Sequence, residues 1–450
     1  MARRETPRSL SPTGRTRIRP RTVRNIKSPH FNRLKQPWEP IIHNNITNPE
    51  LKRSQTSNRT VSSQRIVSRR FLILFALILL PLIAGCTRDI GSESDGWNPP
   101  ISEDGVVYVG TKEGKVVALI DNGFEGVAQR EIWSFPTSID QADISGSYST
   151  PLIQGNLLYV AGIDGYIYAL NKENGSLNDG GWRRPKGLVD ELDPLVAGLA
   201  YDPMNDIILS GNEDGQLNAY TADFGENFWE KPFQAGDTIW STPVIENGTA
   251  YFGSHDHKAY AVRLSSGEEI WQYETDGVIA GKPLLFDDKI IFGSFDKSLY
   301  ALSQDSDGNV SLDWSYEGDN WFWVGAVTDG KTIFAPNMDG NIYALDTNGN
   351  LLWKHNVGAS IVSQPVVIDR GLVVVNKDGE LIVLDTGTAN RGIGRELSNP
   401  IKLDAQVMAA LFAVGDSVFV GSQDRRVRRV DLKVGETAWC WDTKEGSCNN

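Results

Sequence analysis

The sequence predicts an all-β protein whose main domain is an eight-bladed β-propeller with four antiparallel strands in each blade. A motif recurs eight times between Val106 and Val430: a β-branched or aromatic strand, an acidic residue in a turn, and a strand that ends in Ala-Leu or its equivalent. The acidic residues are 39 to 51 residues apart, and a period of this length with several strands is typical of a propeller. They are Glu113, Asp164, Asp214, Asp256, Asp296, Asp339, Asp378 and Asp424.

The stretch from Gly281 to Gly318 illustrates one blade. It contains four strand-like segments, KPLLFDD, KIIFGS, SLYALSQ and LDWSYEG, which are separated by turn residues at 287–288, 295–297 and 305–309. A sheet of these strands is apolar on both faces and cannot bury them alone. Radial packing of several such sheets buries both faces, so eight repeats predict eight blades.

A tryptophan stands near the start of the last strand in every repeat except the seventh, where the stretch 390–399 lacks it. We expect these rings to pack between neighbouring blades, with each indole N–H free to bond a partner. The tryptophans are Trp133, Trp182, Trp229, Trp271, Trp314, Trp353 and Trp439.

The stretch from Tyr343 to Trp353, with Tyr-Ala-Leu-Asp, a glycine turn and a tryptophan, resembles the quinoprotein-type, or PQQ-like, β-propeller repeat. The resemblance covers residues 97–450 and implies the propeller fold. It does not specify a function, because function resides in sites that differ between proteins of one fold.

Charge divides the chain into two parts. Residues 1–70 carry 17 Lys and Arg against 3 acidic residues, whereas residues 71–450 carry 27 against 54. The acidic balance of the propeller argues against binding to nucleic acid or directly to anionic lipid.

A secretory signal is predicted at 69–86. Arg69-Arg70 precedes the apolar run 71–85, which is too short to span a membrane as a mature helix, and Cys86 follows it. The sequence Ile83-Ala84-Gly85-Cys86 resembles a bacterial lipoprotein box, which implies that Cys86 is acylated and becomes the mature N-terminus. The alternative is an ordinary cysteine in an uncleaved anchor. Residues 87–96 would form a short polar tether, so the protein is expected to be extracytoplasmic and held on a membrane by its acyl chains.

Residues 1–68 fit no signal peptide and have the composition of a disordered basic extension. Such a segment could bind nucleic acid through phosphates. We favour the alternative that translation starts near Val61 or Val67, because the signal then has an ordinary length.

The sequence contains little that indicates catalysis. It has no CxxCH motif for a covalent haem and no adjacent cysteine pair, which the PQQ-dependent alcohol dehydrogenases with this repeat carry beside their cofactor. No residues map onto that cofactor site, so no cofactor is expected and PQQ binding is disfavoured. Cys440 and Cys448 are expected to form a disulfide outside the cytoplasm, or to be free thiols in a reducing compartment.

No metal site is expected. His255-Asp256-His257 occupies a repeated turn position and has no third ligand nearby, which favours a solvated turn over a zinc site. The run 305–309 resembles a calcium loop, but its glycine is misplaced and no helix follows, which favours a hairpin turn.

Aromatic residues precede the first strand of several repeats: Trp97, Tyr148, Trp240, Trp321 and Trp323. First strands surround a propeller's axis, so these rings are expected to converge on one mouth of it and to bind a partner. Alternatively, each ring packs into the end of its own blade.

The lipoprotein signal, the eight repeats and the missing cofactor residues together resemble the B component of the outer-membrane protein assembly machinery. In that family the propeller is a scaffold whose loops dock the barrel-inserting subunit, which implies a non-catalytic role with an envelope or membrane protein as partner. The alternatives are a PQQ-dependent quinoprotein-like dehydrogenase and a propeller that senses a ligand or carbohydrate.

Overall fold

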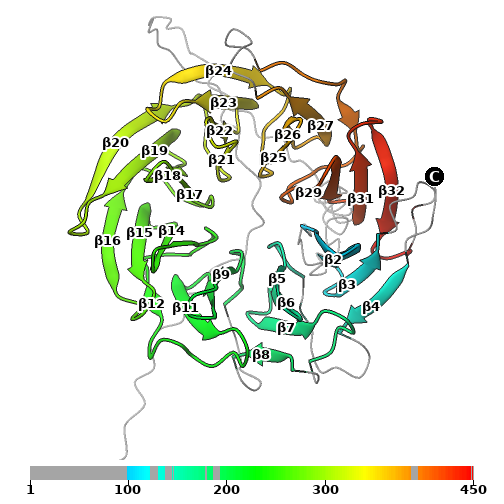
Figure 1. The fold of residues 1–450 in the computed structure, drawn as a ribbon, viewed down its shortest axis with the longest axis horizontal. Helices are drawn as coiled ribbons and strands as arrows, with labels where there is room; N and C mark the ends of the chain where they lie inside the picture. Colours follow the sequence, from blue (N-terminus) through cyan, green and yellow to red (C-terminus); the bar gives the residue numbers. More distant parts are fainter. Residues whose placement is uncertain are drawn as a thin grey trace, which may run out of the picture. The chain divides into compact units, whose positions relative to one another are not determined.

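The computed structural model describes residues 99–121, 130–136, 144, 146–177, 180–185, 193–386, 394–446 and 448. All of them belong to the second of two compact units, Cys86–Asn450. They form eight four-stranded antiparallel sheets arranged in a ring, which confirms the predicted eight-bladed propeller (Figure 1). None of these residues forms a helix with the length and apolarity needed to cross a membrane.

The first half of the ring consists of four blades in chain order. Blade 1 contains β1 (Ile101–Glu103), β2 (Val106–Gly110), β3 (Val116–Ile120) and β4 (Glu131–Phe135). Blade 2 contains β5 (Leu152–Gln154), β6 (Leu157–Ala161), β7 (Ile167–Asn171) and β8 (Trp182–Arg184). Blade 3 contains β9 (Ala200–Asp202), β10 (Ile207–Gly211), β11 (Gln216–Thr221) and β12 (Phe233–Gln234). Blade 4 contains β13 (Val244–Glu246), β14 (Thr249–Gly253), β15 (Lys258–Arg263) and β16 (Glu269–Glu274).

The second half has the same plan. Blade 5 contains β17 (Leu284–Phe286), β18 (Lys289–Gly293), β19 (Ser298–Gln304) and β20 (Val310–Glu317). Blade 6 contains β21 (Val327–Thr328), β22 (Ile333–Pro336), β23 (Asn341–Leu345) and β24 (Leu351–Asn356). Blade 7 contains β25 (Val366–Ile368), β26 (Gly371–Val375), β27 (Glu380–Leu384) and β28 (Ile401–Lys402). Blade 8 contains β29 (Phe412–Val414), β30 (Ser417–Gly421), β31 (Arg426–Asp431) and β32 (Glu436–Asp442).

Each blade is built from one continuous stretch of chain, with its first strand nearest the axis and its fourth outermost (Figure 1). The core lies between neighbouring blades. In one cluster, for example, Ile291 and Ala301 of blade 5 pack with Ile333 and Tyr343 of blade 6. Because no strand is exchanged between the first and last blades, side chains must close the ring.

The tryptophans lie between blades, and in six blades the indole N–H donates a hydrogen bond to the following blade. Each of these N–H groups finds an acceptor at or just after the end of the third strand of the next blade. The pairs are Trp133 to Lys172 O (3.0 Å), Trp182 to Ala222 O (2.8 Å), Trp229 to Leu264 O (2.6 Å), Trp271 to Gln304 Oε1 (2.8 Å), Trp314 to Thr347 O (3.0 Å) and Trp439 to Asp121 Oδ1 (3.0 Å). The indole N–H of Trp353 has no such partner among the described residues.

Two features of the repeat make room for the indole ring. Within a blade, the alanine of the Tyr-Ala-Leu motif lies opposite the tryptophan, as Ala301 does opposite Trp314. In the next blade a turn glycine packs against the ring: a Cβ atom on Gly349 would lie 2.6 Å from Cδ2 of Trp314. The tryptophan of one blade and the turn glycine of the next therefore pack directly against each other.

Candidate functional site

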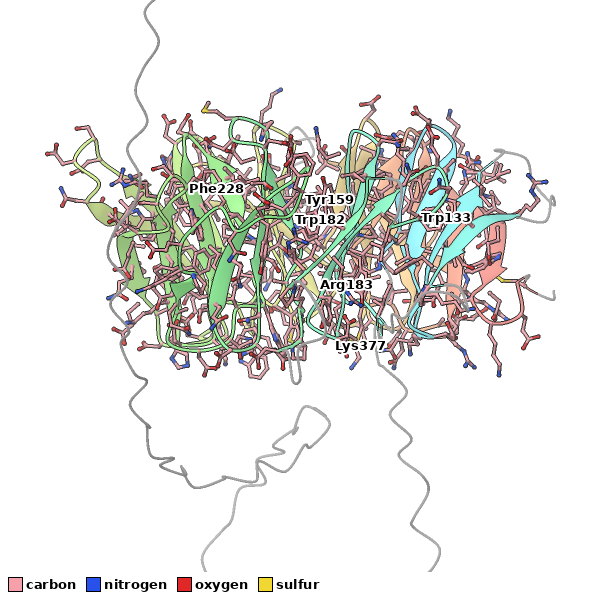
Figure 2. The ribbon with its side chains drawn as sticks, turned by 90° about the horizontal axis from the view of Figure 1, so that it is seen from below. Trp133, Tyr159, Trp182, Arg183, Phe228 and Lys377 are labelled. Carbon is pink, nitrogen blue, oxygen red and sulfur yellow. A yellow bond between two sulfur atoms is a disulfide. The ribbon has the colours of Figure 1, made fainter. Side chains whose placement is uncertain are left out.

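The propeller has two chemically different ends. Because the four strands of a blade alternate in direction, the loops between blades lie at the same end as the turns between second and third strands. We call this the loop end and the opposite one the turn end. In the side view, Lys377 of such a turn lies at one rim, whereas Trp133 and Trp182 lie toward the other (Figure 2).

The acidic residues of the repeat hold the loop end together. In blade 5, Asp296 accepts hydrogen bonds from the backbone N–H of Ser298 (2.9 Å) and from the Tyr300 hydroxyl (2.8 Å). It also accepts the backbone N–H of Asp276, which lies in the loop from the preceding blade (3.1 Å). Burial, followed by the hydrogen bond to Asp296, raises the pKa of Tyr300, so the phenol stays a donor. The carboxylate thus fixes both a turn and the adjoining loop.

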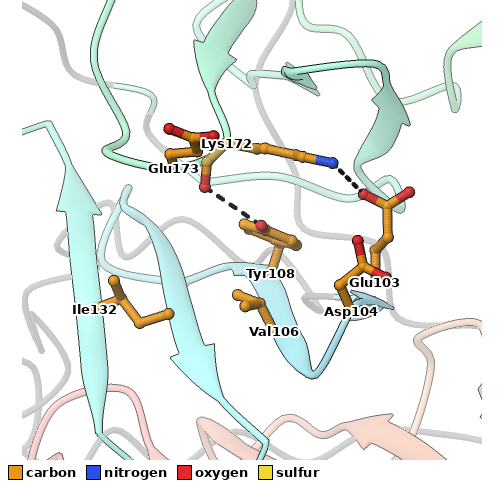
Figure 3. A pocket seen from close by; sticks show the side chains of 7 residues that line it. All are labelled: Glu103, Asp104, Val106, Tyr108, Ile132, Lys172 and Glu173. Carbon is orange, nitrogen blue, oxygen red and sulfur yellow. Dashed lines mark hydrogen bonds and ion pairs between the residues drawn. The ribbon is translucent and has the colours of Figure 1, made fainter.

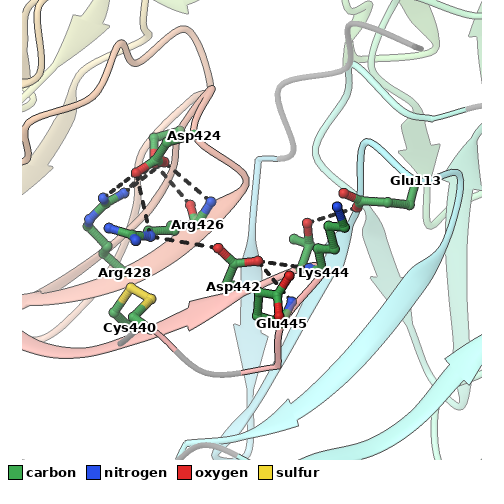
Figure 4. A network of polar contacts seen from close by, with 11 residues as sticks. Glu113, Asp424, Arg426, Arg428, Cys440, Asp442, Lys444 and Glu445 are labelled. Atoms are coloured by element: carbon green, nitrogen blue, oxygen red, sulfur yellow. Dashed lines mark hydrogen bonds and ion pairs between the residues drawn. A yellow bond between two sulfur atoms is a disulfide. The ribbon is translucent and has the colours of Figure 1, made fainter. Parts of the chain in front are cut away.

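The same tyrosine–aspartate pair occurs in blades 2, 4 and 6, with Tyr168, Tyr260 and Tyr343 as donors. In blade 8 an arginine replaces the tyrosine, and Arg428 contacts Asp424 through two nitrogens, at 3.1 and 2.5 Å (Figure 4). Burial acts to raise the pKa of Asp424, but hydrogen bonds from Arg428 and Ser422 outweigh it and hold the pKa below its usual value. These carboxylates are structural parts of the loop end.

Three of the predicted rim residues meet in one cluster at the loop end. Trp240 and Trp323 occupy equivalent positions in the loops that lead into blades 4 and 6, and their ring centroids are 6.4 Å apart. Phe295, from the turn between the second and third strands of blade 5, stacks on Trp321 at 4.7 Å and on Trp323 at 5.2 Å. His255 from blade 4 meets Trp240 edge to face at 4.4 Å. We call these five residues the aromatic cluster; it joins three blades.

One side of the aromatic cluster packs on the core, and the other side is exposed to solvent. Phe322, between the two tryptophans, is fully buried, whereas the Trp321 side chain is 36% exposed. The Nε1 atom of Trp240 and the Nε2 atom of His255 are buried without a hydrogen-bond partner among the described residues. Burial lowers the pKa of His255, so its ring is neutral at pH 7. The cluster combines a stacked aromatic surface with two buried polar atoms that have no hydrogen-bond partner among the described residues.

The sequence predicted Trp240, Trp321 and Trp323 for this end but missed Phe295 and His255. Each of the missed residues immediately precedes an acidic residue of the repeat, which places it in a turn at the loop end. An aromatic ring or imidazole at that position is the signal that could have identified them. Tyr148 stands in blade 2 at the position equivalent to Trp240 and is half-buried.

Other predicted positions lie elsewhere. Trp97 and Cys86 are outside the described residues. His257 is exposed in its turn. Asp305 caps a hairpin turn by accepting the backbone N–H groups of Asp307 (3.0 Å) and Asn309 (2.8 Å). Among the described residues no three His, Cys, Asp or Glu side chains are grouped to hold a metal ion.

Blade 8 meets blade 1 through a polar junction rather than a shared strand. Asp121 accepts hydrogen bonds from Trp439 (3.0 Å) and from Arg429 (3.1 Å), and Thr443 donates to Glu113 (2.8 Å; Figure 4). An apolar cluster underlies them, with valines of blade 1 packed on Phe419 and Trp439. Asp121 therefore accepts the hydrogen bond from the indole of the last tryptophan, a role that a backbone carbonyl has in most other blades.

Cys440 and Cys448 form a disulfide in the structure, with Cα atoms 5.7 Å apart. Cys440 belongs to β32, so the bond holds Cys448 next to the outermost strand of the last blade.

A shallow pocket of about 300 Å³ lies at the turn end between blades 1 and 2 (Figure 3). In its wall the Tyr108 hydroxyl donates to Lys172 O (3.3 Å), and Lys172 pairs with Glu103 (2.5 Å). Burial, with help from Glu103, raises the pKa of Tyr108 to about 12. The polar groups of this wall mainly join the two blades, and the aromatic cluster remains the stronger candidate site.

The fold and the repeat define an eight-bladed propeller of the PQQ-like class. The PQQ_2 family, described as "Outer membrane protein assembly factor BamB", matches residues 213–321 and 321–392. The resemblance inferred from the repeat is thereby confirmed, and the matched stretch contains all five residues of the aromatic cluster.

Individual relatives agree. The chain is 24% identical over 295 residues to outer membrane protein assembly factor BamB of Shewanella oneidensis, covering 62% of this chain and 69% of that protein. It is 25% identical over 379 residues to the factor of the same name from Moranella endobia, covering 76% and 88%. The crystal structure of BamB from Moraxella catarrhalis superposes with a TM-score of 0.57 at 16% identity, covering 79% of this chain and 97% of that one. At that identity the structural likeness concerns the fold alone.

Proposed function

We propose that this protein is a lipid-anchored, extracytoplasmic propeller of the cell envelope that binds a protein partner and acts as a non-catalytic scaffold in outer-membrane protein assembly. The observation that carries the proposal is the aromatic cluster at the loop end. It lies within the stretch that matches the assembly-factor family. The partner class follows from the relatives, whose names place them in that process.

The geometry of the cluster supports protein binding. Trp321 and Phe295 stack with an interplanar angle of 1°, and the exposed Trp321 adds a large apolar surface to the rim. Tryptophan side chains in such positions are frequent hot spots of protein interfaces. The aspartate-capped turns beside them keep the loop end rigid, so little conformational entropy is lost when a partner binds.

The anchor is the second part of the proposal. Residues 69–86 would act as the signal, Cys86 would carry the acyl chains, and residues 87–96 would tether the propeller that starts at 97. With 54 acidic residues against 27 basic ones in 71–450, the propeller itself would be repelled by an anionic bilayer. Membrane attachment would therefore depend on the acyl chains.

The test is co-purification of the barrel-inserting assembly subunit from detergent-solubilised membranes, identified by mass spectrometry. The variant carries Trp240→Ala, Trp321→Ala and Trp323→Ala. A matched control carries Met204→Ala and Phe224→Ala, two strongly exposed side chains (84% and 67%) in turns of blade 3 at the turn end.

We expect the triple variant to lose the subunit while it remains folded at the assay temperature, although lost packing between blades lowers its melting temperature. The control should retain the subunit. Retention by the triple variant, with or without lost stability, would assign the rings to blade packing and contradict the proposal.

A further inference from the structure

Lys282 lies two residues before the first strand of blade 5, at a position that is equivalent in all eight blades. In six blades the residue two positions before the first strand is more exposed than the two buried residues that flank it, which indicates that it faces the axis. Gly281 and Pro283 are buried while Lys282 is exposed, and Ser363, Gln364 and Pro365 follow a similar pattern. The eight equivalent residues are Pro99, Thr150, Gly198, Thr242, Lys282, Gly325, Gln364 and Ala410.

Several of these positions lie close to their neighbours in the next blade. The backbone N–H of Gly198 donates to Thr242 Oγ1 at 2.9 Å. A Cβ atom on Gly325 would lie 2.3 Å from the backbone oxygen of Lys282 and 3.0 Å from Nε2 of Gln364. Residues from successive blades therefore touch at this level, and Lys282 is the one charged residue among the eight.

The amine of Lys282 has neither an ion pair nor a hydrogen bond within the described part of the chain. Surrounding protein lowers its pKa from the usual value, and no neighbouring carboxylate offsets the effect. An ammonium group that is partly desolvated and unpaired gains more from an incoming anion than a fully hydrated surface lysine does.

Lys282 lies next to the aromatic cluster. Ser241, which follows Trp240, donates a hydrogen bond to the backbone oxygen of Gly281 at 2.9 Å. On the other side, a Cβ atom on Gly281 would lie 3.3 Å from the backbone oxygen of Trp323. The loops that carry the two indoles therefore flank the segment that carries the amine.

We propose that Lys282 and the neighbouring indoles of Trp240 and Trp323 recognise one acidic side chain of a protein partner together with an adjacent apolar or aromatic residue. The inference rests on the proposed function and adds the chemistry of the bound segment. A partner residue is favoured over a free inorganic anion because the acidic propeller repels anions, and the contact with the indoles offsets that repulsion.

The experiment uses small probes whose binding does not require the partner. Saturation-transfer NMR measures binding of N-acetylphenylalanine, which has a ring and a carboxylate, and of its amide, which has the same ring without charge. Inorganic phosphate is a third probe. The proteins are wild type, Lys282→Met, Lys282→Arg and a control, Lys377→Met, which removes a lysine from a loop-end turn of blade 7.

We expect wild type to prefer the acid over the amide by about tenfold, the ratio that one charge-assisted hydrogen bond supports. Lys282→Met should abolish the preference, whereas Lys282→Arg and Lys377→Met should retain it, with all four proteins unfolding at similar temperatures. No preference in wild type, or a preference that survives Lys282→Met, would overturn the inference. Phosphate that displaces the acid as effectively from Lys282→Met as from wild type would also overturn it.

A pull-down separates this inference from the proposed function. If the triple tryptophan variant loses the assembly subunit but Lys282→Met binds it as wild type does, the carboxylate contact is wrong and the scaffold role stands. If neither variant loses the subunit, the proposed function itself fails.

Discussion

The contact between a tryptophan and the turn glycine of the next blade yields a quantitative prediction. Gly349 and Gly435 occupy corresponding turns of blades 6 and 8, with φ of +79° and +81°. A Cβ atom on Gly349 would lie within 2.8 Å of three ring atoms of Trp314, whereas one on Gly435 would meet nothing within 4 Å. The difference arises because blade 7, which precedes Gly435, lacks the tryptophan.

Both substitutions to alanine place an L-residue in the left-handed region, which costs about 1–2 kcal/mol each. Gly349→Ala must in addition displace an indole ring from a packed interface, for which overpacking costs of about 1–3 kcal/mol are typical. We therefore expect Gly349→Ala to lower the free energy of unfolding by roughly 1–3 kcal/mol more than Gly435→Ala does.

Urea unfolding followed by tryptophan fluorescence and circular dichroism measures both values. In a Trp314→Leu background the excess cost of Gly349→Ala should shrink, because the ring that it displaces is gone. Equal destabilisation by the two alanines, or an unchanged excess in the Trp314→Leu background, would refute this account of how the blades pack.

Three further predictions concern closure and anchoring. Asp121→Ala removes the acceptor of Trp439 and Arg429, so urea unfolding should show a loss of about 1.5–3 kcal/mol, and a loss below about 0.5 kcal/mol would mean that the apolar cluster alone closes the ring. Deletion of Gly281–Gly318 removes one blade and should give insoluble or protease-sensitive protein; a soluble product with an unchanged melting temperature would instead indicate an open array of blades. Cys86→Ser should release the protein from membranes or leave an uncleaved precursor, as fractionation and mass spectrometry can establish, and unchanged membrane retention with an unmodified N-terminus downstream of residue 86 would contradict the lipid anchor.

The fold was predictable because every blade repeats the same local sequence pattern. A strand pair, an acidic turn and a tryptophan recur with a nearly constant period, and neither the blade count nor the strand order requires long-range information. The place of Trp314 between blades followed from its position at the last strand. Its glycine partner was visible in the sequence as Asn348-Gly349, but that turn and the ring of the preceding blade meet only in three dimensions.

The candidate site was only partly predictable. Trp240 and Trp323 share a register, so their common end of the propeller could be inferred from the repeat. Phe295 and His255 lie in turns between second and third strands, whereas the tryptophans lie in loops between blades. To predict that they meet, one must know that these turns and loops lie at the same end of the propeller. The contacts of Asp121 that close the ring were not predictable, because Arg429 and Trp439 lie 308 and 318 residues away in the last blade.

The scaffold role is tested most directly by site-specific photo-cross-linking in living cells. A photoreactive phenylalanine derivative replaces Trp321, the exposed ring of the aromatic cluster, or Phe224, the exposed ring at the turn end. We predict that position 321 cross-links to the barrel-inserting assembly subunit and that position 224 does not. Cross-linking to that subunit from position 224 alone, or from neither position, would contradict the claim that this protein binds its partner through the loop end.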